Sequence, residues 1–353
     1  MPPNIAVELD CSVAVNDSTY TITQCDFTFD EIETQITGVV QKKKNYYVNL
    51  KTEISNISIT DLQKYMTVEL QNKLKKWSPQ GLLELKIESK GYITEQTLPE
   101  LRVDFDLDKG LFSFEGKKAS VEGKGVFKAR NVYNAKTCNI VFDTLSCVFN
   151  NSTYNGHASI NDFTLFHIKS LGQLSVSIPD LMSLSKKVLP VDMKGIVEGR
   201  IAFETDLQRL DTINDHLFEK LNLKTDLKLH DGYFLYKANK FSEAHDIEAS
   251  FRSNNDEYII DTCNFNYFGT QMICSGRLSD LVAFIYSDYK TLNADLVVKG
   301  GCIDYNSIIN SVPHDTSNIV IPKQYNVKVK FDSECLKYNK MSLLNLRGSL
   351  SFV

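Results

Sequence analysis

Apolar and polar side chains alternate along most of this chain. Val7, Leu9 and Val13 recur on one side of the segment 7–15, "VELDCSVAV", and acidic residues alternate with apolar ones in 101–108, "LRVDFDLD". A period of two is typical of a β-strand with one apolar and one polar face. The pattern predicts a mainly β protein, a long antiparallel, curved or twisted sheet of repeated hairpins that forms a β-groove or half-pipe.

Helical spacing is confined to short stretches. Every fourth residue from Leu62 to Leu74 is apolar, and Thr60 and Gln63 have capping-box spacing, so a helix is expected at about 60–77. Further short helices are expected at about 179–188, 212–221 and 304–311. Such short helices, placed at repeat junctions, are too small to cover a sheet of many strands.

The chain also repeats itself. "QCDFTF", "SCVFNN" and "TCNFNY" share Cys-x-Phe, and their cysteines Cys25, Cys147 and Cys263 are 122 and 116 residues apart. The repeat predicts a partial β unit at 1–80 that ends in helix 60–77, and a second unit at 81–194 that ends in helix 179–188. A third unit, 195–312, holds the last two helices, and 313–353 begins a truncated further repeat.

One stretch has the acid spacing of a calcium loop. Asp104, Asp106, Asp108 and Glu115 occupy places 1, 3, 5 and 12 of a twelve-residue window. The window 122 residues later keeps the apolar places and the glycine but replaces the acids, with His230 for Asp108 among the changes. We therefore expect the acids to be a solvated strand face, without a metal or other cofactor.

The same comparison predicts a hairpin. Lys109-Gly110 would form a two-residue turn that opposes Leu107 to Phe112, and Asp231-Gly232 would form the sister turn. The glycines of "EGKGVF", at 122–127, are expected to mark a bulge or close packing instead of a phosphate cradle.

Composition excludes several classes. Hydrophobic residues make up 42% and charged residues 24% of the 353 residues, as in a folded protein. The net charge is −5 with scattered cations, so no nucleic-acid partner is expected, and the basic stretch "QKKKNYY" at 41–47 is interpreted as a solvated strand end. Motifs for metal, nucleotide or nucleophilic chemistry are missing, so the chain is not expected to be an enzyme. Both ends stop in strand-like sequence, which suggests a piece of a longer protein.

The eight cysteines leave two alternatives open. Cys11 and Cys25, Cys138 and Cys147, and Cys263 and Cys274 lie on neighbouring strand-like runs, whereas Cys302 and Cys335 stand alone. They are either buried thiols or cross-strand disulfides of an oxidising compartment.

Apolar strand faces exceed what the short helices can cover. They must pack on a second sheet, close on themselves, or meet an apolar ligand. The candidate lipid-groove residues are Val7, Leu9, Val13, Leu101, Val103, Phe105, Leu107, Phe112, Phe114, Leu227, Leu229, Phe234, Ile259, Phe265 and Phe268. The alternative is a structural or adhesive β-rich envelope protein whose sheets pack on each other, with glycans bound by surface aromatics.

The ordered recurrence of several motifs resembles the AsmA-like proteins of Gram-negative envelopes. The segments that carry the resemblance are "GLLELKIESKGYI", "LPELRVDFDLDKGLFSFEG", "LKLHDGYFLYK", "YIIDTCNFNYFGTQMICSGRLSDL" and "LNADLVVKGGCIDYNSIIN". The resemblance implies repeated β-grooves that bind or conduct phospholipid through its acyl chains, in outer-membrane biogenesis or homeostasis. It further implies a periplasmic location, with an inner-membrane anchor in a segment missing from this chain, and it supplies no catalytic residues.

Overall fold

The computed structural model describes residues 7–30, 32–66, 68–75, 77–114, 116–131, 134–184, 191–206, 221–236, 243–281, 291–311 and 325–352. The described residues fall into two compact units. Unit 1 comprises those up to Asn150, Tyr154–Ser170 and Asp206, and unit 2 comprises Asn151–Thr153, Leu171–Thr205 and those after Asp211. The predicted repeat boundaries differ from this division and stay a prediction.

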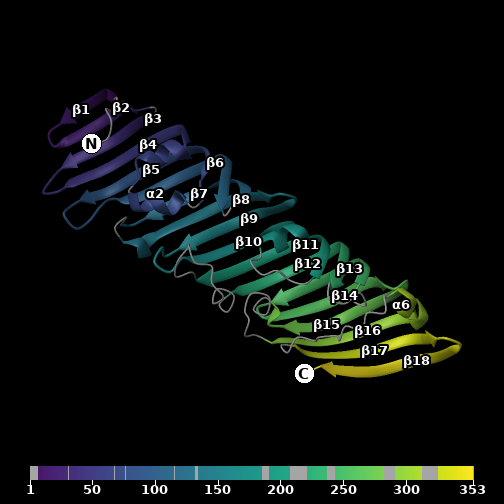
Figure 1. Cartoon of the computed structure of the whole chain (residues 1–353). Coiled ribbons are helices and arrows are strands. Elements are labelled where there is room, and N and C mark those ends of the chain that lie inside the picture. Colours follow the sequence, from purple (N-terminus) through teal and green to yellow (C-terminus); the bar gives the residue numbers. More distant parts are fainter. Residues whose placement is uncertain are drawn as a thin grey trace. The chain divides into compact units, whose positions relative to one another are not determined.

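Unit 1 is a single layer of hairpin-linked strands (Figure 1). Each strand from β1 to β8 pairs antiparallel with the next. Their bounds are β1 Val7–Asn16, β2 Thr19–Phe29, β3 Ile32–Lys42, β4 Tyr46–Ser58, β5 Gln80–Ile93, β6 Glu100–Phe114, β7 Lys117–Ala129 and β8 Cys138–Phe149, followed by β9 Ser152–Asn161. A short 3-10 helix, Ala135–Thr137, precedes β8.

Unit 2 is built in the same way, with one exception. The strands from β11 to β16 pair antiparallel in sequence order, as do β17 and β18, but β16 and β17 are parallel. The bounds are β10 His167–Ser177, β11 Val191–Asp206, β12 Asn222–Tyr236, β13 Glu243–Asn254, β14 Glu257–Tyr267, β15 Thr270–Ser279, β16 Leu292–Asp304, β17 Tyr325–Tyr338 and β18 Met341–Phe352. The prediction of a mainly β, antiparallel protein with few helices is confirmed.

The helix expected at 60–77 is two helices, α1 Ile59–Lys64 and α2 Val68–Lys75. The N-cap of α1 is Ser58, whose hydroxyl accepts the backbone N–H of Thr60, so Thr60 is not the cap. Tyr65 ends α1 and donates its hydroxyl to the Asp30 carboxylate at 2.8 Å. This hydrogen bond ties the end of α1 to the residue that follows β2.

Two other predicted helices are present in the part of the chain that the structure describes, although positions 185–188 of the one predicted at 179–188 lie outside it. Helix α3 spans Ile178–Leu184, and α6 spans Tyr305–Ser311 behind Asp304, whose carboxylate accepts the Asn306 N–H. The remaining predicted helix, at 212–221, lies outside the described residues except for its last position.

The hairpin predicted at Lys109-Gly110 is wrong. Strand β6 runs without interruption from Glu100 to Phe114, and a β-bulge lies where the turn was expected. Strand β12 is likewise continuous, with its bulge at Asp231. Both Lys109 and Asp231 have positive φ, 51° and 52°. A bulge needs the same left-handed backbone as a tight turn, so the local sequence does not distinguish them.

Two disulfides join neighbouring strands. Cys11 pairs with Cys25 across β1 and β2, and Cys302 pairs with Cys335 across the parallel strands β16 and β17. Cys302 and Cys335 were not expected to meet, because a parallel pairing brings together residues from two separated strands. Four cysteines are free thiols: Cys138, Cys147, Cys263 and Cys274.

Candidate functional site

The sheet of unit 1 has one apolar face. Residues directly opposite each other on paired strands share a face, so the strand register assigns each side chain. The unit 1 apolar face, as we define it, consists of Phe27, Ile36, Leu50, Ile54, Leu83, Leu85, Ile87, Leu101, Val103, Phe105, Leu107, Phe112, Phe127, Ile140 and Phe142. Strand β1 continues this face with Val7, Leu9 and Val13.

Most of these side chains are only partly buried. Leu107 is 8% exposed, but its neighbours on the face belong to the partly exposed class, and Leu9 at the β1 edge is 64% exposed. No second sheet of unit 1 covers this face within the described strands. The face therefore offers apolar area that the unit itself does not bury.

Aromatic rings lie across glycines on this face. A Cβ added at Gly125 would lie 2.8 Å from Cζ of Phe105, so the ring occupies the place of the missing side chain. The Phe105 ring also meets Phe142 edge-on, with centroids 5.3 Å apart. The close packing predicted for "EGKGVF" is thus present, and the register between β7 and β8 shifts at Lys124/Gly125. Both rings therefore belong to the unit 1 apolar face.

Unit 2 carries an equivalent face. The unit 2 apolar face consists of Val197, Phe203, Leu223, Leu227, Leu229, Phe234, Phe251, Ile260, Phe265, Met272, Leu296, Val298, Val329 and Phe331. Leu227 and Met272 are each 8% exposed, and most of the others are partly exposed. The free thiols Cys263 and Cys274 lie opposite each other on this face. Burial raises the pKa of Cys263 to about 11, so it stays a neutral, nearly apolar group.

The structure places most predicted groove residues on these two faces, with three exceptions. Ile259 pairs with Arg252 and Arg277 on the polar face, because a bulge after Ile260 shifts the alternation. Phe268 occupies the β14–β15 turn, with φ of 46°. Strand β6 includes Phe114, but its side chain lies outside the described part of the chain.

Several residues of the faces were missed. Leu85 and Ile87 alternate with charged residues, and Phe142 and Phe251 lie in runs of the same kind. The alternation of apolar and polar residues in these runs could have predicted their place on the apolar faces. Ile260 was missed for another reason, since only the three-dimensional register shows that it, and not Ile259, is on the apolar face.

The opposite face of unit 1 is polar and ion-paired. Arg102 donates to Asp104 through Nη2 at 2.6 Å and lowers the pKa of that carboxyl. Lys124 reaches Asp106 at 2.5 Å, and its own pKa is raised by that hydrogen bond. Asp108 lies opposite Leu82, on the same face. The acids thus alternate with the apolar residues as expected, while Glu115 lies outside the described residues.

The polar face of unit 1 has a depression of about 750 Å³ across β4 to β9. Its lining includes the carboxylates of Glu84, Asp106, Asp108 and Glu122, together with Lys124 and His157. The described ranges contain no group of three or more His, Cys, Asp or Glu residues positioned to hold a metal ion. Lys124 and Asp106 form an ion pair within this lining, which also includes Leu82, Leu107 and Leu145.

Comparison of the chain with protein-family models, curated protein sequences and solved structures finds no match. The AsmA-like resemblance therefore stays a prediction from the motifs. Among the helices of the described residues, none has the length and hydropathy needed to cross a membrane.

Proposed function

We propose that this chain is a non-enzymatic lipid-binding segment whose apolar faces receive phospholipid acyl chains. The observation that carries the proposal is the partial exposure of the unit 1 apolar face, which no second sheet of that unit covers. Phe105, Val103 and Leu101 present side chains along one strand that would otherwise face water.

The energetics favour an extended apolar ligand. Each methylene transferred from water to an apolar surface contributes about 0.8 kcal/mol of favourable free energy to binding. An acyl chain lying along several strands would bury many methylenes together with the ring faces of Phe105 and Phe142. Such binding needs no polar contact, and the ion-paired polar face would stay in water.

The sequence motifs extend the proposal to a biological setting. On the AsmA-like resemblance, the chain would be a periplasmic segment of an envelope protein, held at the inner membrane by a part outside this chain. It would bind or conduct phospholipid for outer-membrane biogenesis or homeostasis.

Native mass spectrometry of protein purified without detergent tests the binding. We expect adducts with the mass of phospholipids, which a Val103→Asp variant should lose, because a carboxylate on the apolar face would meet the acyl chain. Val126→Asp is the matched control, since Val126 is a partly exposed valine on the polar face of the adjacent strand, opposite Asp104.

Retention of the fold is checked through the single tryptophan, Trp77, whose fluorescence reports on unit 1. A photoactivatable phospholipid provides an independent readout in the unmodified protein, with cross-links expected on β5 to β8 at apolar-face residues. A mass spectrum that shows the protein without phospholipid adducts, or cross-links confined to the polar face, would contradict the proposal.

A further inference from the structure

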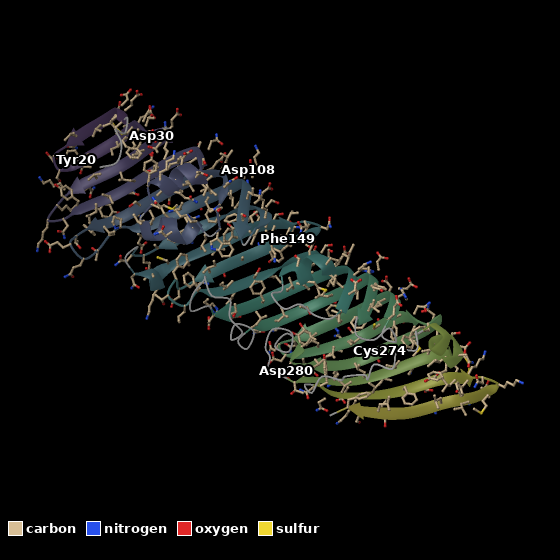
Figure 2. All side chains as sticks on the ribbon, viewed as in Figure 1. Tyr20, Asp30, Asp108, Phe149, Cys274 and Asp280 are labelled. Carbon is tan, nitrogen blue, oxygen red and sulfur yellow. A yellow bond between two sulfur atoms is a disulfide. The ribbon has the colours of Figure 1, made fainter. Side chains whose placement is uncertain are left out.

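Every second connection of unit 1 lies at the same end of its strands, because antiparallel strands alternate in direction. These connections are the turns at 17–18 and 43–45, the loop 94–99, the described residues 130–131 and 134–137 between β7 and β8, and the turn 162–166. We call this the loop end. Helices α1 and α2 follow β4 at the opposite end. Tyr20 lies near the loop end of β2, and Asp30 follows the other end of that strand (Figure 2).

Backbone hydrogen bonds join neighbouring connections of the loop end. The N–H of Lys42 donates to the Ser18 carbonyl at 2.7 Å, and the N–H of Phe163 donates to the Ala135 carbonyl at 3.0 Å. Lys43 also donates to the Asn45 carbonyl within its own turn. These bonds tie the β1–β2 turn to the end of β3, and the β7–β8 connection to the β9–β10 turn.

The loop end is cationic although the chain as a whole carries −5. Lys42, Lys43 and Lys44 are exposed, and no carboxylate of the described residues lies within ion-pair distance of them. Arg130 and Lys136 add two further cations in the β7–β8 connection. Asp17, Glu95 and Asp162 lie in the other connections or beside Lys136, and Glu100 begins β6 directly after the loop 94–99, so the excess of cations is greatest at Lys42, Lys43 and Lys44.

Exposed amphipathic and apolar side chains flank these cations. Tyr46 is 47% exposed and pairs with Ile93, which is 42% exposed, at the rim of the unit 1 apolar face. Tyr92 is 50% exposed and meets Tyr47 edge-on, and Leu165 in the last turn is 51% exposed. Tyrosine and lysine together suit the boundary between a bilayer and water, because each has an apolar body and a polar tip.

We propose that the loop end docks on the surface of an anionic phospholipid bilayer. Its cations lie in two connections, with Lys42, Lys43 and Lys44 at the β3–β4 turn and Arg130 and Lys136 in the β7–β8 connection, so they match a charged plane better than a single phosphate group. The net negative charge of the whole chain would restrict the attraction to this end. The inference depends on the charge and exposure of the loop end and does not require the acyl-chain binding proposed above.

Co-sedimentation with vesicles tests the docking. The protein should sediment with vesicles of phosphatidylcholine mixed with phosphatidylglycerol, and far less with vesicles of phosphatidylcholine alone. The triple variant K42Q/K43Q/K44Q should bind the anionic vesicles roughly 100-fold more weakly, since each lysine near such a surface contributes about a fivefold effect. Added salt should reduce binding of the unmodified protein.

The matched control is K224Q/K228Q/K337Q, which removes the same charge from exposed lysines of unit 2 and should bind as the unmodified protein does. Equal losses in the two triple variants, equal binding to both kinds of vesicle, or binding to a single-stranded oligonucleotide but not to vesicles would overturn the proposal. Val103→Asp separates the two proposals, because it should keep vesicle docking while losing bound acyl chains.

Discussion

Strands β6 of unit 1 and β12 of unit 2 share a bulge before a glycine and differ in polar chemistry, and β12 has a second register shift between Gly232 and Phe234. In β6 the bulge lies between Leu107 and Gly110, and in β12 it lies between Leu229 and Gly232. In each strand a leucine before the bulge and a glycine after it belong to the apolar side. What recurs is the geometry that keeps the apolar residues on one face across the bulge.

The residue opposite each bulge is a glutamate, yet the two glutamates make different contacts. Glu248 accepts the Asp231 N–H at 3.0 Å and contacts the ring Nδ1 of His230 at 2.8 Å. No equivalent hydrogen bond joins Glu122 to the described residues of the β6 bulge. The comparison teaches that the polar face varies between units while the bulge and the apolar face persist.

Replacement of the glycine after each bulge should give the largest losses in unfolding free energy. Gly110→Ala would place a Cβ against the Val121 carbonyl oxygen, and Gly232→Ala would place one 2.7 Å from both Cβ and the carbonyl oxygen of Ile247. We expect losses of about 2–3 kcal/mol in unfolding free energy, since a backbone group cannot move aside easily. The loss should be larger at Gly110.

Urea unfolding followed by Trp77 fluorescence measures the Gly110 variant, because the Trp77 carbonyl accepts the Ser113 N–H of β6 at 2.7 Å. Hydrogen exchange of β12 and β13 measures the Gly232 variant. A change below about 0.5 kcal/mol at either position would mean that the bulge tolerates a side chain and does not require glycine.

Substitution of the two glutamates should give the next largest changes in stability. The changes should differ between the two bulges. Glu248→Ala removes the acceptor of a backbone N–H and should cost about 1 kcal/mol, whereas Glu122→Ala should change stability by less than half of that. Hydrogen exchange in the two bulges provides the measurement. Equal losses would show that the bulges are stabilised in the same way after all.

Lowering the pH should remove the contribution of Glu248 to the stability of the folded state. Hydrogen bonds from Asp231 and His230 lower the pKa of Glu248, so the folded state favours its carboxylate. The stabilisation is therefore complete above the unfolded-state pKa of about 4.3 and is lost as the pH falls through the lower folded-state value. The stability difference between the unmodified protein and Glu248→Gln should shrink as the pH falls from about 5 to below 4. A difference that grows in acid would refute this assignment.

The smallest effect is expected for the ion pairs of the polar face. Asp106→Asn breaks the contact with Lys124, a pair whose side chains are 33% and 68% exposed. Exposed pairs contribute about 0.2–1 kcal/mol and are screened by salt. The urea midpoint of the variant should therefore be slightly below that of the unmodified protein at low salt, and the two midpoints should agree at high salt. A large loss of stability that persists at high salt would indicate a structural role for Asp106.

Alternation predicted the apolar face well where strands are regular. Leu101, Val103, Phe105 and Leu107 share a face as expected, since each step along a regular strand turns the side chain over. Ile259 fails because one extra residue in the bulge reverses the alternation beyond it. Lys109-Gly110 fails for a related reason, because positive φ serves a turn and a bulge alike.

The sequence by itself determined the strand-rich architecture, the apolar and polar sides of the regular strands, and the approximate sites of the short helices. These depend on local periodicity and capping, which a chain carries without its tertiary contacts. Only the tertiary structure decided that β6 and β12 pass straight through their bulges, that β16 and β17 run parallel, and that Cys302 meets Cys335. Strand pairing joins residues far apart in the chain, and a single bulge changes every contact beyond it.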